Sequence, residues 1–289
     1  MRLGVCTTDF DRAPAEAIFQ KAASFGFDCV QLALDSISEC GFEATGECEI
    51  PVSVPESSLA AIRAASEKYH LPIAVMNGTF NMAHPDPQVL RDSLHRFPGF
   101  LDMAMALQCP MVSLCSGTRN AAHLWRPHPD NTTPEAYQTM LAAMKEVTRE
   151  AEKRNIVLAI ETEASNVIST PEIAYRTLQD VGSPNLKIIL DCANLFLPGQ
   201  AYRLNARASL DKAFYWFGSQ IALAHGKDIH PGSGISFCAT GHGMVDFPHA
   251  LHLLRTYGFT GDMMIHGVYE DALFPAAQRY MRDLIRKVF

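Results

Sequence analysis

Eight short apolar runs, separated by longer segments with helical patterning, most constrain how this chain can fold. In chain order they cover residues 3–6, 29–32, 73–76, 111–114, 157–160, 188–190, 221–224 and 263–265. The runs barely alternate between polar and apolar residues, which is typical of strands buried on both faces of a parallel sheet. Repeated strand and helix units favour an α/β fold with a closed (β/α)8 TIM barrel over an open doubly wound sheet.

The helical segments begin and end with residues that support this alternation. Thr133 and Thr170 each precede a Pro-Glu pair at the start of a helical pattern, as N-cap residues do. Gly182 and Gly258 follow helical patterns, where left-handed C-caps are common. No Gly-x-Gly-x-x-Gly motif follows the first run, which disfavours a dinucleotide-binding fold. We expect residues 1–289 to form one barrel domain.

Charge and hydropathy argue against two classes of partner. The formal net charge of −7 lacks the basic bias of a protein that binds nucleic acid. No stretch approaches the roughly 18 to 20 continuous apolar residues of a membrane span, and Asp9 and Asp11 interrupt any signal-peptide pattern. We therefore predict a cytoplasmic protein without a nucleic-acid or membrane partner. Its eight cysteines lack paired spacings and are expected to be reduced packing residues.

Polar residues follow the last four apolar runs. They are Glu161, Asp191, His225 and His266. Because active sites of such barrels lie at the C-terminal ends of the strands, these side chains should meet at one rim. Two carboxylates and two imidazoles suit Mn²⁺, Zn²⁺, Co²⁺ or Fe²⁺. The alternative is that the acids cap the next helices and the histidines bond to neighbouring carbonyl groups.

The motifs around these strand ends occur in a characteristic order. They are Ala159-Ile160-Glu161, Leu190-Asp191-x-x-Asn194, Ala224-His225-Gly226-Lys227-Asp228 and, at residues 241–247, Gly-His-Gly-Met-Val-Asp-Phe. With residues 81–85 and 116–117, they resemble the xylose isomerase-like TIM-barrel superfamily of sugar phosphate isomerases and epimerases, through essentially the whole chain. The resemblance implies that Glu161, Asp191 and His225 bind a divalent metal ion, and it makes a homodimer or homotetramer reasonable.

Two positions depart from the family pattern. Relatives usually have glutamate where His266 stands, and many have histidine where Asn194 stands. His266 is thus predicted as a metal ligand from its position alone, and the usual two-glutamate proton-transfer scheme is left open. The superfamily also contains apurinic endonucleases that hold three zinc ions. Val75 and Cys115 lie near the positions of their additional histidines, so that chemistry is not expected here.

These observations favour a metal-dependent isomerase or epimerase of a small sugar or polyol derivative. The ion would stabilise an enediolate, while Glu161 or Glu163 acts as base. The two glutamates stand two residues apart, so they share one side of an extended segment. His266 would return the proton to the other carbon atom. A metal-dependent dehydratase of a keto-polyol and a barrel that binds a sugar without turnover remain as alternatives.

Five further residues are predicted to contact the substrate. Asn81 and Asn194 would bind hydroxyl groups, because an amide offers both donors and an acceptor. Lys227 would stabilise an oxyanion or a carboxylate. Trp125 and Arg126 would form a lid over the sugar ring. The structural alternatives are turn caps for the asparagines, a solvated ion pair for the lysine and an ordinary surface loop for the other two residues.

Overall fold

The computed structural model describes residues 1–46, 48 and 50–289, and it contains a closed barrel of parallel strands. Around the barrel the strand order is β1-β10-β7-β6-β5-β4-β3-β2. This architecture confirms the predicted (β/α)8 fold. The bounds of the barrel strands are β1 (Leu3–Cys6), β2 (Cys29–Leu32), β3 (Ile73–Asn77), β4 (Met111–Leu114), β5 (Val157–Glu161), β6 (Leu186–Asp191), β7 (Ile221–Gly226) and β10 (Asp262–Ile265).

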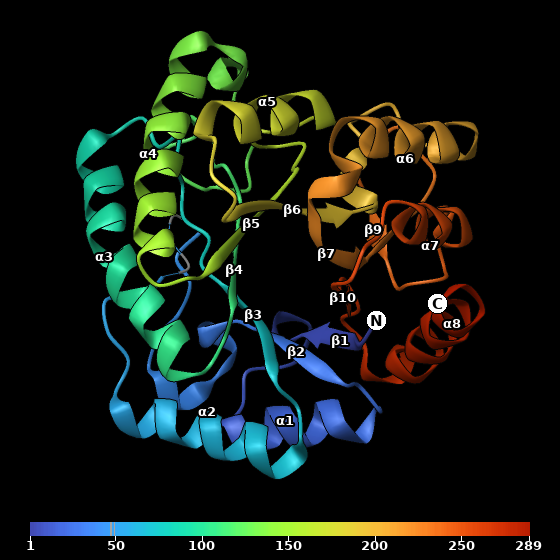
Figure 1. Ribbon diagram of the computed structural model, residues 1–289, viewed down its shortest axis with the longest axis horizontal. Coiled ribbons are helices and arrows are strands. Elements are labelled where there is room, and N and C mark those ends of the chain that lie inside the picture. Colours follow the sequence, from blue (N-terminus) through green and yellow to red (C-terminus); the bar gives the residue numbers. More distant parts are fainter. Residues whose placement is uncertain (47, 49) are drawn as a thin grey trace.

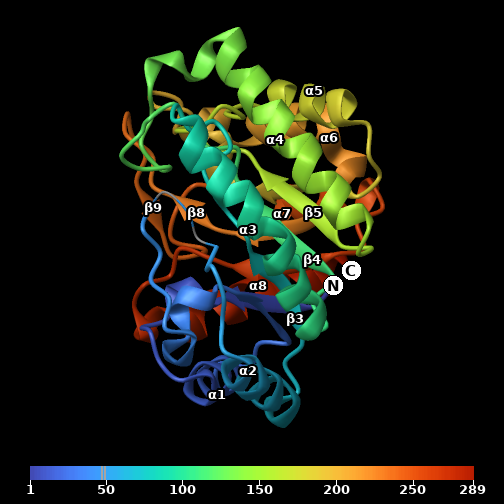
Figure 2. The ribbon, with the colours of Figure 1, turned by 90° about the vertical axis from the view of Figure 1, so that its left-hand side faces the viewer.

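The α-helices surround the strands, as Figures 1 and 2 show from two directions. Both views also place the two chain termini side by side, because β1 pairs with β10 and α8 packs against β1. The bounds of the helices are α1 (Ala15–Ser24), α2 (Glu56–Tyr69), α3 (Pro87–Ala106), α4 (Pro134–Glu152), α5 (Pro171–Val181), α6 (Arg203–Phe217), α7 (Phe247–Thr256) and α8 (Phe274–Val288).

Local backbone geometry agrees with the predicted helix termini. Thr133 Oγ1 accepts a hydrogen bond from the Ala136 backbone N–H at 3.2 Å, and Thr170 caps α5 in the same way. Gly182 and Gly258 have φ values of 70° and 74°, the left-handed conformation that ends a helix without steric strain in glycine. Short side-chain and backbone signals thus set both ends of these helices.

Two features differ from the sequence prediction. Strand β6 begins at Leu186, two residues before the apolar run that predicted it. The run was shorter than the strand because Lys187 is charged. Lys187 is accommodated because its Nζ donates to Gln220 Oε1 at 2.9 Å. In addition, the loop after β7 contains a short antiparallel pair, β8 (Asp228–Ile229) with β9 (Phe237–Cys238). Strands of two residues leave no periodic signal in a sequence.

The cysteines behave as predicted. Among the described residues none of the eight forms a disulfide, and all except Cys238 are buried. Among the helices of the described residues, none combines the length and apolarity needed to cross a membrane.

A cluster of four phenylalanines joins the two ends of the chain. The Phe274 ring, at the start of α8, lies 5.0 Å from the Phe10 ring and 5.1 Å from the Phe25 ring, measured between centroids. The Phe27 ring meets it edge-on at 6.3 Å. Phe274 is fully buried, so its ring fixes α8 against the first βα unit.

We expect Phe274→Ala to lower the free energy of unfolding by about 3–5 kcal/mol, because it leaves a large cavity among three aromatic rings. Urea denaturation followed by circular dichroism measures this change. The matched control is Phe289→Ala, since Phe289 is 46% exposed and its loss should change stability by less than about 0.5 kcal/mol. Equal effects of the two substitutions would contradict the conclusion that the Phe274 ring fixes α8 against the first βα unit.

Candidate metal centre and active site

Two layers of side chains fill the inside of the barrel. A buried apolar layer includes Cys29, Val75, Ala159, Ile189, Leu223 and Met264. Since successive side chains of a strand alternate between its faces, the residue two positions further along each strand also points inward. Those residues are Gln31, Asn77, Glu161, Asp191, His225 and His266. A polar layer therefore lies directly above an apolar one, toward the C-terminal rim.

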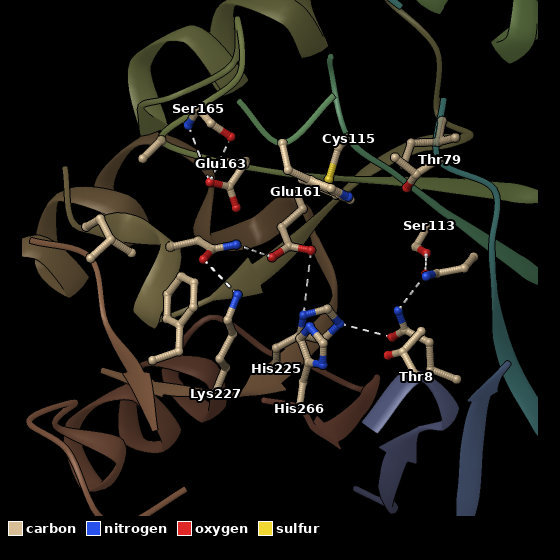
Figure 3. A pocket seen from close by; sticks show the side chains of 18 of the residues that line it. Thr8, Thr79, Ser113, Cys115, Glu161, Glu163, Ser165, His225, Lys227 and His266 are labelled. Carbon is tan, nitrogen blue, oxygen red and sulfur yellow. Dashed lines mark hydrogen bonds and ion pairs between the residues drawn. The ribbon is translucent and has the colours of Figure 1, made fainter. Parts of the chain in front are cut away.

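This polar layer borders a cavity of about 570 Å³, which is within the ordinary range for small-molecule sites. Figure 3 shows Glu161, Glu163, His225, His266 and Lys227 around it. Loop residues complete the lining on the outer side, and the aromatic ones among them are Trp125, Phe237 and Tyr269. The cavity thus has a charged floor and partly aromatic walls.

Glu161, Asp191 and His225 come together as a potential metal-binding group. Each offers one ligand atom, and these atoms all lie within 4.8 Å of one another. His225 Nδ1 is 3.4 Å from Asp191 Oδ2 and 3.6 Å from Glu161 Oε2. The structure therefore gathers three of the four predicted ligands at one point.

Asp191 and His225 each form hydrogen bonds through one polar side-chain atom and leave the other, which faces the metal-binding group, without a hydrogen bond. Asp191 Oδ1 accepts from the backbone N–H groups of Ala193 and Asn194, at 2.9 and 3.1 Å, and His225 Nε2 donates to Gln31 Oε1 at 3.0 Å. By contrast, Asp191 Oδ2 and His225 Nδ1 are buried and have no hydrogen-bond partner. Leaving such atoms unsatisfied costs about 1–3 kcal/mol each. A divalent cation suits them, because it would be ligated by both atoms and by Glu161 Oε2.

His266 lies beside this group but is not one of its members. Its ring meets the His225 ring edge-on, with centroids 5.4 Å apart. His266 Nδ1 is hydrogen-bonded at 2.9 Å to Oδ1 of Asp9, whose carboxylate is fully buried and also accepts from the Val268 backbone N–H. This pairing leaves Nε2 as the remaining ring nitrogen. The metal-ligand role of His266 stays a prediction.

Asn194 connects the metal-binding group to a buried lysine. Its Nδ2 donates to Glu161 Oε1 at 2.5 Å, and its Oδ1 accepts from Lys227 Nζ at 3.0 Å. Burial alone would lower the pKa of Lys227, but the charges of Asp191, Glu161 and Glu163 outweigh it and raise the pKa. Lys227 is therefore a permanent cation at the cavity, not the solvated side chain of the alternative interpretation.

Asp228 anchors the loop that follows β7. Its carboxylate accepts from the backbone N–H groups of Gly241, Gly243 and Val245, at 3.0, 2.9 and 3.0 Å. A Cβ at Gly243 would lie 2.2 Å from Asp228 Oδ1, so glycine is required for this close approach. The anchored loop brings Phe237 to the cavity, where its ring centroid lies 3.7 Å from Lys227 Nζ.

Glu163 also lines the cavity, two residues after Glu161. Its Oε1 accepts from the Ser165 backbone N–H at 3.3 Å and from Ser165 Oγ at 3.2 Å. Burial raises the pKa of Glu163, and the nearby charge of Glu161 adds to this effect while Lys227 opposes it. A carboxylate with a raised pKa is a stronger base, which suits proton transfer.

The predicted substrate contacts divide into two groups. Asn194, Lys227 and Trp125 line the cavity. Asn81 is buried outside its lining, where its Oδ1 accepts from the Ala83 and Thr118 backbone N–H groups and so fastens a turn. Arg126 is exposed to solvent and also absent from the lining. The geometry therefore does not support substrate contacts by Asn81 or Arg126.

Sequence reasoning missed several polar residues of the site. Gln31, Asn77 and Ser113 lie at the cavity and are linked to His225 by hydrogen bonds. Each is a polar residue within or at the end of an otherwise apolar strand, and each stands two positions after an inward-facing apolar residue. That spacing was a usable signal. Asp9 left no such signal, because its role depends on contact with His266 at the other end of the chain.

Residues 19–285 match the model of the family described as xylose isomerase-like TIM barrel. The chain belongs to this family, which confirms the resemblance inferred from its motifs. A comparison with curated protein sequences gives no match.

Several solved structures share the fold over nearly their whole length. The IolI protein with a bound zinc atom has a TM-score of 0.76 and 17% identity, with coverage of 100% of this chain and 99% of that one. A D-psicose 3-epimerase from Clostridium cellulolyticum H10 has a TM-score of 0.71 and 15% identity, covering 100% and 99%. The 3-keto-D-glucoside 4-epimerase YcjR from E. coli has a TM-score of 0.71 and 13% identity, covering 98% and 99%.

We expect the protein to bind one divalent ion per chain and Asp191→Asn to weaken that binding by more than about 100-fold. Loss of a residue behind a ligand already costs about 10–100-fold, so loss of a charged ligand should cost more. Isothermal titration calorimetry with Mn²⁺, Co²⁺ and Zn²⁺ measures the affinity. Asp211→Asn, the same change at an exposed site on α6, is the control. A wild type that shows no bound ion and no thermal shift with any of these ions would contradict the metal centre.

Metal affinity should also depend on pH. Burial lowers the pKa of His225, but the charges of Glu161 and Asp191 prevail and raise it to about 9 in the metal-free protein. Below that pH an incoming ion must displace the proton from the imidazole. The dissociation constant for Co²⁺ should therefore rise about tenfold for each unit by which the pH falls from about 8 to about 6. A constant affinity over this range would argue against displacement of a proton from His225.

Proposed function

We propose that this protein is a divalent-metal-dependent isomerase or epimerase of a small sugar derivative. The main support is a pair of buried atoms without a hydrogen-bond partner, Asp191 Oδ2 and His225 Nδ1. They lie beside Glu161, which lines the floor of the cavity. Two of the proteins with the same fold are named as sugar epimerases, and a third holds zinc. The ion would be Mn²⁺, Zn²⁺, Co²⁺ or Fe²⁺, because the donors combine carboxylate oxygens with imidazole nitrogen.

A bound divalent ion would act as a Lewis acid that polarises a carbonyl oxygen and favours an enediolate. Glu163 would then remove the proton from the adjacent carbon atom. Its raised pKa makes it a suitable base, and Ser165 holds one carboxylate oxygen so that the other is free for the transfer. Glu161 is less suited to this step, because its two oxygens face Asn194 and His225.

His266 would return the proton to the opposite face of the same carbon atom in an epimerisation, or to the neighbouring carbon atom in an isomerisation. The buried Asp9 carboxylate accepts the Nδ1 proton of His266, so Nε2 is the nitrogen that exchanges a proton with the substrate. The Asp9 and His266 pair would thus replace the glutamate that relatives place after the eighth strand. Lys227 would stabilise negative charge on the substrate oxygen.

The charges of the cavity favour a neutral substrate. Among the lining residues that the structure describes, Lys227 is the single lysine or arginine, and it is already surrounded by Asp191, Asn194 and Glu161. A phosphate group would need further cations. Trp125 and Phe237 instead offer apolar surface for the C–H groups of a sugar ring. We therefore propose an unphosphorylated sugar.

Solvent deuterium exchange tests this function. The metal-loaded protein is incubated in D₂O with D-psicose, D-tagatose and a 3-keto-D-glucoside, and the sugars are examined by mass spectrometry and NMR. We expect an isomer or epimer that carries one deuterium, because the base exchanges its proton with solvent. Glu163→Gln should slow the reaction by about 100-fold or more while leaving metal affinity unchanged. Glu67→Gln, an exposed change on α2, is the matched control.

The same experiment separates the remaining alternatives. His266→Gln should retain exchange into the substrate but lose product, because it blocks delivery of the second proton. A product that has lost water would indicate the metal-dependent dehydratase. Sugar binding without exchange or product would indicate a barrel that binds its ligand without turnover, and would contradict the proposed reaction.

A further inference from the structure

A chain of hydrogen bonds crosses the inside of the barrel from β4 to His225 on β7. Ser113 Oγ lies 2.7 Å from Asn77 Oδ1, and Gln31 Nε2 lies 3.0 Å from the same oxygen. Gln31 Oε1 then lies 3.0 Å from His225 Nε2. Figure 3 labels Ser113 and His225, the two ends of this chain of hydrogen bonds. We call Ser113, Asn77 and Gln31, which belong to β4, β3 and β2, the His225 relay.

The donor-to-acceptor direction of the hydrogen bonds in the relay, which we call its polarity, follows from Ser113, its first member. Ser113 has one hydroxyl proton, and its oxygen is closer to Asn77 Oδ1, at 2.7 Å, than to Met76 O, at 3.3 Å. The proton is therefore directed at Asn77. Since Asn77 Oδ1 accepts this bond, the Gln31 group that faces it must be the donating NH₂. The carbonyl oxygen of Gln31 is thereby turned toward His225.

This polarity selects one tautomer of His225. An oxygen at Nε2 accepts a hydrogen bond, so in the neutral form that binds a metal ion Nε2 carries the ring proton and Nδ1 offers its lone pair. Nδ1 is the unpartnered atom that faces Asp191 and Glu161. In the opposite tautomer, an N–H would occupy that position and exclude a cation.

Burial makes the selection effective. Gln31 and Ser113 are 6% and 4% exposed, so water competes weakly for their hydrogen bonds. Reversing the Gln31 amide would set two N–H groups against each other at His225 and two oxygens against each other at Asn77. Restoring the bonds would require Asn77 and Ser113 to turn as well. The three side chains therefore hold one orientation together.

We propose that the His225 relay holds His225 in the tautomer and ring orientation that bind the metal ion, so that Gln31, Asn77 and Ser113 are positioning residues. This role rests on the proposed metal-dependent function. Because relay residues also line the cavity, activity would not separate a contact with the sugar from an effect on the metal. The test therefore measures Zn²⁺ binding in the absence of sugar.

The deciding variant is Gln31→Leu, which fills similar space but offers no acceptor to Nε2. We expect its Zn²⁺ dissociation constant, measured by calorimetry, to rise about 10–100-fold. Gln31→Glu and Asn77→Asp should stay within about threefold of the wild type or bind more tightly, because each keeps an oxygen where the relay needs an acceptor. Gln220→Leu is the matched control, since Gln220 also accepts a side-chain hydrogen bond but precedes β7 at the opposite end of the barrel.

NMR of the zinc-loaded proteins gives a second readout. In the wild type and in Gln31→Glu, the His225 Nε2–H resonance should be shifted downfield and exchange slowly with water, as expected of a hydrogen-bonded proton. In Gln31→Leu it should move upfield and exchange faster. A role in packing alone would change thermal stability without moving this resonance, and Gln31→Glu would not restore it.

The outcomes distinguish the relay from the function that it serves. If the wild type binds Zn²⁺ tightly and Gln31→Leu has the same affinity or the same Nε2–H resonance, the proposed role of the relay is overturned. The proposed function is then unaffected. Weak binding by both Gln31→Leu and Gln31→Glu would also overturn the role of the relay, since the acceptor would then not matter. Wild-type protein without Zn²⁺ affinity would instead overturn the proposed function itself. If Gln31→Leu fails to fold, Asn77→Leu applies the same test one residue further from the histidine.

Discussion

The parallel pairing of Leu3 with Met263 and Val5 with Ile265 closes the sheet, and the site depends on that closure. In a closed parallel barrel every strand ends at the same rim, and the alternation of side chains sends each second residue to the axis. Closure therefore brings the inward side chains of β2 and β7, which are separated by β1 and β10, within reach of each other across the interior. Only in that arrangement does Gln31 Oε1 come within 3.0 Å of His225 Nε2. The apolar layer beneath, which includes Leu223 and Met264, supplies the packing that keeps these polar groups in place.

The buried charges of the rim explain why a cation suits this site. Asp191 is fully buried next to Glu161, and repulsion between the two carboxylates is offset by Lys227 and, in the metal-free protein, by protonated His225. Burial tends to raise the pKa of Asp191, but Lys227 and His225 lower it overall, so the carboxylate stays ionised. A divalent ion would replace the proton of His225 and satisfy both unpartnered atoms. The same residues thus balance one another's buried charges in the metal-free protein and would hold the metal ion when it binds.

The family resemblance implies a glutamate at the position where this chain has His266. A strand-end glutamate would bring a further negative charge to the rim, whereas His266 brings an imidazole bound to a buried carboxylate from the loop after β1. The two arrangements differ in charge, and in the proposed reaction His266 takes the proton-transfer role of that glutamate. Asn194 is a second departure, and here it links Lys227 to Glu161. Glu163 lies at the same cavity, where Ser165 donates to its Oε1.

The barrel could be predicted from the sequence, because apolar runs of three or four residues and helix caps such as Thr133 and Gly182 are local signals. The sequence also predicted that Glu161, Asp191 and His225 meet at one rim, as they do, since the strand-end rule needs only the position of each residue after its run. The folded structure was needed to show that Asn81 fastens a turn, that Arg126 lies in solvent and that Asp9 holds His266. It likewise decided the link between Gln31 and His225. These outcomes depend on contacts between residues far apart in the chain, and no local pattern encodes which distant side chain closes a hydrogen bond.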